Sequence, residues 1–179
     1  MAVPEKYDAI VIGTGQSGVP LAKTLAHEGW KTAIIERYFV GGSCINYGCT
    51  PSKTMAASSS VIYKISKAEA YGIYTSKTAV NLRKIIDRKR GMVKSFREGL
   101  EKGIKKTINL ILIRGDAGFI NKKVIKINLN DGGFKLITAD KIFINTGGHP
   151  VIPEIDGIDT IDYLTSASVM SWKKYHLTL

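Results

Sequence analysis

The sequence predicts an α/β fold that opens with a parallel strand–helix–strand unit and continues into a small antiparallel sheet. Three observations predict this fold: an apolar run followed by a glycine-rich turn, a second apolar run shortly after it, and a β-rich stretch beyond Asn109. The chain has 179 residues, of which 44% are hydrophobic and 23% are charged. This composition is typical of a folded globular protein.

The first four elements follow one another closely. Tyr7–Ile12 is an apolar strand, Gly13–Gly18 a tight turn, and Ser17–Glu28 a helix, and Thr32–Glu36 is the next strand. Two strands joined by a helix within about thirty residues must run parallel, with a right-handed crossover. The chain therefore opens with a Rossmann-like half.

The middle and end of the chain change character. Two helices are expected first, one starting at Pro51 and one from about Asn81 to Lys106. Short apolar runs separated by turn residues then predict a small antiparallel meander and a buried return strand. The expected strands are Leu110–Ile113, Lys123–Asn128, Phe134–Thr138 and Lys141–Asn145.

The formal charge of +11 raises the question of a nucleic-acid or membrane partner. Much of the positive charge falls between Arg83 and Lys106, where apolar residues recur at helical spacing, so we interpret it as a solvated helix face. No nucleic-acid motif accompanies it. No apolar run of about eighteen residues and no signal peptide is present, so no membrane partner and a cytoplasmic location are expected.

The glycine turn fits the pattern G-x-G-x-x-G between a strand and a helix, at Gly13, Gly15 and Gly18. In that context backbone N–H groups and the helix dipole bind a pyrophosphate. Glu36 stands at the end of the second strand, where an acidic side chain binds a ribose hydroxyl pair. The motif favours dinucleotide binding over a purely structural turn, and it does not distinguish FAD from NAD.

The only two cysteines, Cys44 and Cys49, lie in the run GGSCINYGCTPSK that ends at Lys53. A zinc site would need four ligands, and the three histidines have no metal-binding spacing, so no metal site is expected. A pair of inert buried thiols is the other alternative. Nearby glycines and a lysine that can support a thiolate favour a redox-active pair.

The run from Gly42 to Lys53 resembles the cysteine motif of the class I pyridine nucleotide-disulfide oxidoreductases. Two further segments agree: Gly115–Phe119 is similar to the segment whose alanine contacts the FAD adenine, and Ile144–Pro150 is similar to the A-T-G-x-x-P segment. The form Ile-Asn-Thr-Gly most resembles the mercuric reductase-like branch. The resemblance covers essentially the whole chain.

The resemblance implies an FAD-dependent oxidoreductase with a set of cofactor-binding residues. Electrons would pass from NADH or NADPH to FAD, to the Cys44–Cys49 disulfide, and to a small-molecule or metal-ion substrate. Cys49 would face the flavin, Cys44 would exchange with substrate, and Lys53 would lie beside the flavin ring. The implied FAD contacts are Gly13, Gly15, Gln16, Ser17, Gly18, Glu36, Arg37, Gly42, Ser43, Lys53, Ala117, Thr146 and Gly147.

The family's NAD(P)H motif, its later FAD segment and its C-terminal interface domain have no counterpart here. We therefore expect a truncated FAD-binding domain over residues 1–158 and a lead-in to an NAD(P)-binding domain over 159–179. Full-length relatives are homodimeric, and the chain is expected to need further domains or a partner chain. The alternatives are a catalytically silent flavin-binding or interaction module and, less favoured, a compact NAD-dependent dehydrogenase.

Overall fold

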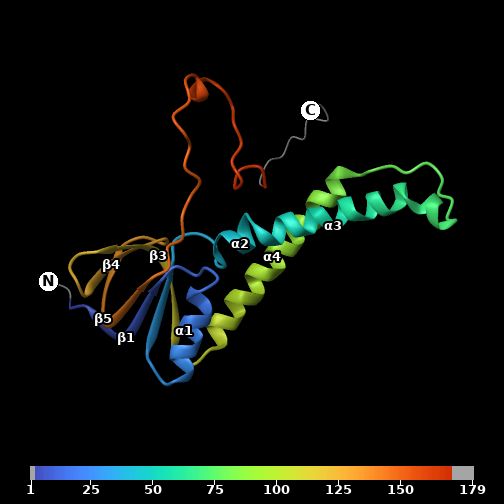
Figure 1. Cartoon of the computed structure of the whole chain (residues 1–179). Helices are drawn as coiled ribbons and strands as arrows, with labels where there is room; N and C mark the ends of the chain where they lie inside the picture. The colour runs from blue at the N-terminus through green and yellow to red at the C-terminus, as the bar shows by residue number, and fades with distance from the viewer. Residues whose placement is uncertain (1–2, 171–179) are drawn as a thin grey trace. The chain divides into compact units, whose positions relative to one another are not determined.

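The computed structural model describes residues 3–170, which divide into two compact units (Figure 1). The first unit holds residues 3–44 and 97–149, and the second holds residues 45–96 and 150–170. Of the predicted lead-in over 159–179, residues 171–179 lie outside the described residues. No helix within residues 3–170 is long and apolar enough to cross a membrane.

Five strands build the first unit. They are β1 (Glu5–Ile12), β2 (Thr32–Glu36), β3 (Leu110–Phe119), β4 (Val124–Leu129) and β5 (Phe134–Ile144), and α1 (Gly18–His27) connects β1 to β2. The parallel part of the sheet has the order β3-β2-β1-β5, and β4 runs antiparallel to both β3 and β5. Because β4 joins the two outer strands, the sheet closes into a barrel. The predicted α/β fold with an antiparallel meander is confirmed.

The largest differences from the predicted strands concern β3 and β5. The expected strands at Phe134–Thr138 and Lys141–Asn145 are one continuous strand, β5, and the strand expected at Leu110–Ile113 extends to Phe119. Each long strand changes partner along its length: β3 pairs with β2 up to Arg114 and with β4 from Gly115 onward. At this change a Cβ on Gly115 would lie 2.5 Å from the carbonyl oxygen of Asn128, so glycine allows the close approach.

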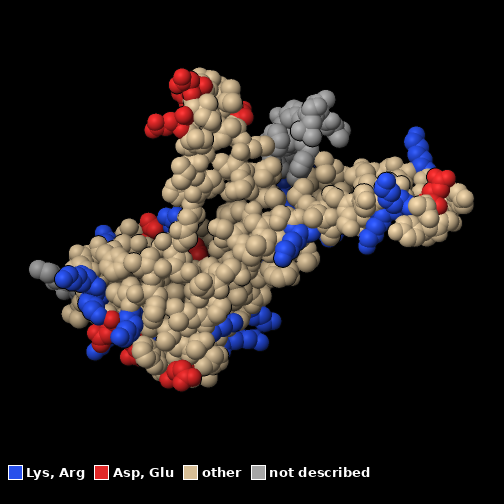
Figure 2. All heavy atoms as spheres, viewed as in Figure 1, with Lys and Arg blue, Asp and Glu red and all other residues tan. Residues whose placement is uncertain are grey.

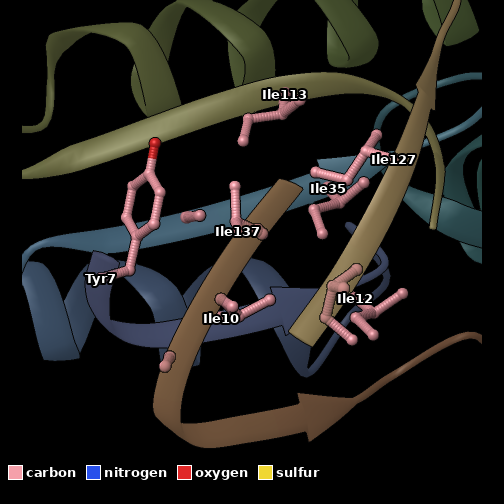
Figure 3. Packing of buried hydrophobic residues seen from close by; sticks show 10 residues of the cluster. Tyr7, Ile10, Ile12, Ile35, Ile113, Ile127 and Ile137 are labelled. Carbon is pink, nitrogen blue, oxygen red and sulfur yellow. The ribbon is translucent and has the colours of Figure 1, made fainter. Parts of the chain in front are cut away.

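The barrel interior is filled by aliphatic side chains and Tyr7 (Figure 3). Successive strand residues point to opposite faces, so Ile10 and Ile12 of β1 face this interior while Val11 faces outward to α1. Both faces of β1 are therefore buried, as its nearly continuous apolar sequence predicts. The interior cluster consists of Tyr7, Ile10, Ile12, Ala33, Ile35, Ile113, Ile125, Ile127, Ile137 and Ala139.

A second cluster fills the outer face of the parallel strands, beneath the helices. Val19, Ala22 and Ala26 of α1 pack there against Val11 and Ile34. Ile104, from the C-terminal part of α4 (Leu82–Lys106), is fully buried in the same cluster. The apolar periodicity of both helices thus accounts for how they cover the sheet.

The second unit contains α3 (Cys49–Ser66) and the N-terminal part of α4, which lie side by side in Figure 1. Arg88 of α4 ties them together, because its Nη2 donates to the carbonyl oxygen of Thr54 and, at 2.8 Å, to Ser58 Oγ. Lys89 is almost fully buried and donates to the carbonyl oxygen of Met170. Burial lowers the pKa of Lys89.

The basic side chains of this unit that Figure 2 shows are dispersed. On the face seen in Figure 2, Lys and Arg side chains are spaced along the α3–α4 pair and do not form one patch. Ile86 and Val93 of α4 are buried while Arg83, Lys84 and Arg90 around them are exposed. This arrangement fits the expected solvated helix face.

Candidate functional site

The candidate site lies where the strand order reverses. From β1 the chain runs outward through β2 to β3, whereas β5 pairs with the opposite side of β1. Ile12 is paired with Ile144, so the carboxyl ends of β1 and β5 lie side by side. The parallel strands β3-β2-β1-β5 have the order of an open α/β sheet. Ligands bind to such sheets at the switch point, beyond the carboxyl ends of the strands. The predicted Gly13–Gly18 turn follows β1, and Thr146 and Gly147 follow β5.

The glycine turn is packed too closely for other residues. Gly13 has φ of +105°, and a Cβ on it would lie 2.2 Å from the carbonyl oxygen of Asn145. A Cβ on Gly18 would lie 2.2 Å from the carbonyl oxygen of Gly13. The side chain of Asn145 completes the packing by donating a hydrogen bond from Nδ2 to Gly13 O at 3.2 Å. Two of the motif's glycines are therefore required by close contact.

The same turn presents backbone donors. No residue among 3–170 accepts a hydrogen bond from the N–H groups of Gly15, Gln16 or Ser17, which lead into α1. The first turn of α1 carries no acidic residue. Unused amides at the positive end of a helix are a favourable site for an anion such as a phosphate.

Glu36 at the end of β2 is held toward this turn. Its Oε2 accepts hydrogen bonds from the backbone N–H of Thr14 at 3.2 Å and from the Thr14 hydroxyl, and its Oε1 accepts one from the N–H of Tyr38 at 2.9 Å. The side chain is only partly buried. A fixed and accessible carboxylate beside a phosphate-binding turn suits the hydroxyls of a sugar.

The start of the cysteine segment packs against the glycine turn. Gly41 and Gly42 have φ of +105° and +61°, and a Cβ on Gly42 would lie 2.8 Å from the Cα of Gly15. This turn leads into α2 (Gly42–Asn46), a short helix that the sequence did not predict. The predicted residues Gly42, Ser43 and Cys44 are thereby placed in the first unit, next to the glycine turn.

Arg37 and Ala117 lie beyond Glu36 on neighbouring segments of the first unit. Ala117 pairs with Ile127 across β3 and β4 and packs against the barrel core. The guanidinium of Arg37 lies 3.9 Å from the carboxylate of Asp116, the residue before Ala117. Gly147, on the other side of the site, has φ of +68°, and a Cβ added to it would meet no heavy atom of the described residues within 4 Å.

The remaining predicted residues, Cys49 and Lys53, belong to the second unit. Cys49 is the first residue of α3, and both side chains are exposed. Ser52 fixes this helix start, because its Oγ donates to the carbonyl oxygen of Gly48 at 2.7 Å. Both cysteines are thiols in this structure, with Cys44 half-buried and Cys49 exposed. No group of three or more His, Cys, Asp or Glu residues suited to a metal ion occurs within residues 3–170.

Sequence reasoning missed two residues of this site, Thr14 and Asn145. Thr14 is fully buried, and its hydroxyl donates to Glu36 and accepts from the N–H of Gly41 at 3.1 Å. Asn145 contacts the glycine turn through both its backbone and its side chain. The available signals were a hydroxyl inside the glycine motif and an amide directly after an apolar strand.

The chain resembles known proteins along nearly its whole length. The family model described as pyridine nucleotide-disulphide oxidoreductase matches residues 7–177. The mercuric reductase of Staphylococcus aureus is 35% identical over 168 residues, which are 94% of this chain and 30% of that protein. The probable pyridine nucleotide-disulfide oxidoreductase RclA of Escherichia coli is 34% identical over 157 residues, 87% of this chain and 32% of that protein.

A solved structure agrees with these sequence matches. The HOCl-induced flavoprotein disulfide reductase RclA from Escherichia coli superimposes with a TM-score of 0.74 and 33% sequence identity, covering 94% of this chain and 34% of that chain. Its Cu(II) complex matches equally well, with a TM-score of 0.74. The chain thus spans about a third of the length of these relatives.

Proposed function

The chain belongs to the pyridine nucleotide-disulphide oxidoreductase family, and on that basis we propose that it supplies the FAD site and redox cysteines of an electron-transferring enzyme. Members of this family are oxidoreductases that use FAD and NAD(P)H. In the whole protein, electrons would pass from NAD(P)H through FAD and the cysteine pair to a substrate. One observation supports the proposal most directly. The glycine turn, Glu36 and Asn145 meet at the β1–β5 switch point.

The residues present fit FAD. The close packing at Gly13 and Gly18 leaves no room for a Cβ. The unused N–H groups that follow Thr14 suit the pyrophosphate of FAD. Glu36 would accept a hydroxyl of the adenosine ribose, and Ala117 would contact the adenine. Thr146 and Gly147 would approach from the β5 side. When bound, FAD would supply two-electron transfer between the nicotinamide and the cysteines.

The cysteine pair would take up those electrons by thiol–disulfide chemistry. Two electrons and two protons convert the Cys44–Cys49 disulfide into two thiols. The Cys44 thiolate would then attack a substrate disulfide, forming a mixed disulfide and releasing one substrate thiolate, and Cys49 would attack Cys44 to release the second thiolate and re-form the protein disulfide. A soft metal ion bound by the two thiolates would instead take up the same two electrons as the protein disulfide re-forms. Lys53 lies one turn into α3 from Cys49. Its positive charge would stabilise a thiolate.

The relatives indicate a class of substrate for the whole protein. Mercuric reductase and a Cu(II)-bound disulfide reductase are among the matches, which favours a metal ion or a disulfide as substrate. We propose a flavin and disulfide domain over residues 1–158 and a lead-in to a nucleotide-binding domain over 159–179. A cytoplasmic homodimer is the proposed state of the whole protein.

Titration of the purified chain with FAD tests this proposal. Flavin fluorescence and absorbance would be followed before and after reduction with dithionite, with Cys44→Ser and Cys49→Ser as matched variants. We expect saturable binding in all three proteins and a long-wavelength absorbance band that Cys49→Ser alone loses. Wild-type chain that is folded and binds no FAD would contradict the proposal.

A further inference from the structure

The Thr14 hydroxyl stands between two parts of the site that are distant in sequence. It donates a hydrogen bond to Glu36 Oε2, 22 positions away, and accepts one from the backbone N–H of Gly41, 27 positions away. Its side chain is fully buried. A buried hydroxyl with both a donor and an acceptor partner fixes both of them.

The contacts of Glu36 show what this does to the carboxylate. A carboxylate accepts about four hydrogen bonds. Thr14 supplies two of them to Oε2, through its N–H and its hydroxyl, and Tyr38 supplies one to Oε1. The protein therefore orients the carboxylate. The one acceptor position that remains is on Oε1. The side chain of Glu36 is partly exposed.

We propose that Thr14 is a positioning residue that holds Glu36 to recognise a ribose hydroxyl of an adenosine diphosphate group. The inference rests on the proposed function, because it concerns the adenosine half of the same FAD site. Thr14 touches no ligand in this role; it acts through Glu36. A carboxylate oriented before binding loses less conformational entropy when a hydroxyl arrives.

The same hydroxyl connects the ribose-binding carboxylate to the cysteine segment. Its bond to the N–H of Gly41 fixes the turn that leads into α2, which carries Cys44. Close packing of Gly42 against Gly15 supports the same turn. Both ends of the cofactor site in the first unit thus depend on one side chain.

The test compares two ligands that differ only in the ribose hydroxyls, ADP and 2′,3′-dideoxy-ADP. Calorimetric titration of the 179-residue chain with each, and with FAD, gives the ratio of the two dissociation constants. We expect wild type to prefer ADP about tenfold, as the loss of one hydrogen bond to a charged group predicts. Thr14→Val, which keeps the side-chain shape, should reduce this preference to about twofold or less, and Thr14→Ser should retain it.

A double-variant comparison separates positioning from general stability. In a Glu36→Gln background the preference for ADP should already be small, and adding Thr14→Val should change it little. A purely structural role would lower the melting temperature of Thr14→Val and leave the ratio for the folded protein unchanged. That outcome would overturn the inference, and so would equal affinity of the wild type for ADP and 2′,3′-dideoxy-ADP. In either case FAD binding would still support the proposed function. Failure of wild type to bind FAD or ADP would overturn both.

Discussion

The side-chain amide of Asn145 donates a hydrogen bond to the carbonyl oxygen of Gly13 across 3.2 Å, joining residues 132 positions apart. The backbone of Asn145 takes part as well, because its N–H donates to Ile12 O at 2.8 Å. The end of β5 is thus attached to the end of β1 at the point where the glycine turn begins. The geometry of the turn depends on this contact as well as on its glycines.

Asn145→Ala removes the amide and leaves the Gly13 carbonyl without this donor. We expect the free energy of unfolding to fall by about 1 kcal/mol and FAD to bind several-fold more weakly. Urea unfolding and flavin titration measure the two effects. Asn128→Ala, on the exposed side of β4, is the control and should change neither; equal behaviour of the two variants would contradict the role given to Asn145.

Gly18→Ala should be strongly unfavourable. The added Cβ would lie 2.2 Å from Gly13 O and 2.5 Å from Asn145 Nδ2, so the turn would have to move. We expect a loss of roughly 1–3 kcal/mol in urea unfolding. Gly99→Ala in α4, where an added Cβ would meet nothing within 4 Å, should instead stabilise the chain by about 1 kcal/mol. A tolerated Gly18→Ala would refute the close packing.

Glu5 gives the first unit a defined response to acid. Hydrogen bonds from Lys135 at 2.7 Å and Lys31 at 2.8 Å lower the pKa of Glu5 to about 2 from its ordinary 4.5. Because the folded-state pKa is lowered, this stabilisation is complete above about pH 4.5 and is lost as the pH falls toward 2. The side chain is 37% exposed, so we expect a contribution of only about 1 kcal/mol.

Urea unfolding at about pH 7 and about pH 3 checks this expectation with Glu5→Gln. The variant should be less stable than wild type near neutral pH, and the difference should shrink in acid. Asp156→Asn, in an exposed segment, serves as the matched control and should not alter the pH dependence. A difference between Glu5→Gln and wild type that is the same at both pH values would exclude this mechanism.

Arg88 is expected to hold α3 against α4 in the second unit. Arg88→Met keeps the aliphatic stem and removes the hydrogen bonds to Thr54 O and Ser58 Oγ, so we expect a loss of about 1–2 kcal/mol. Hydrogen exchange should accelerate in the first turns of α3. Arg83→Met, an exposed position on the same helix, should leave exchange unchanged, and similar exchange in both variants would disprove the assignment.

The two thiols should differ in reactivity in the reduced chain. Cys49 is exposed and Cys44 is half-buried, so limiting iodoacetamide should alkylate Cys49 severalfold faster. Peptide mass spectrometry after short reaction times measures the ratio. Unfolding in urea should bring the two rates together, and a faster reaction at Cys44 in the folded chain would contradict the greater exposure of Cys49.

Local sequence patterns were sufficient to predict several parts of the molecule. The apolar run Tyr7–Ile12, the glycine spacing after it and the apolar face of the following helix each concern neighbouring residues, and the structure has β1, α1 and β2 there. The motif from Gly42 to Lys53 likewise indicated the family. The boundaries of β3 and β5 could not be found in this way, because a strand that changes partner keeps the same local sequence pattern on both sides of the change.

Residue type and short spacing alone were enough to predict the α/β class, the glycine turn and the family, and to single out Glu36 as a candidate site residue. The closure of the sheet into a barrel by β4, the bond between Thr14 and Glu36, and the bond between Asn145 and Gly13 emerged only in the folded chain. These contacts join positions that the folded backbone brings together from distant parts of the sequence. Their geometry depends on strand register and packing, which no local pattern contains.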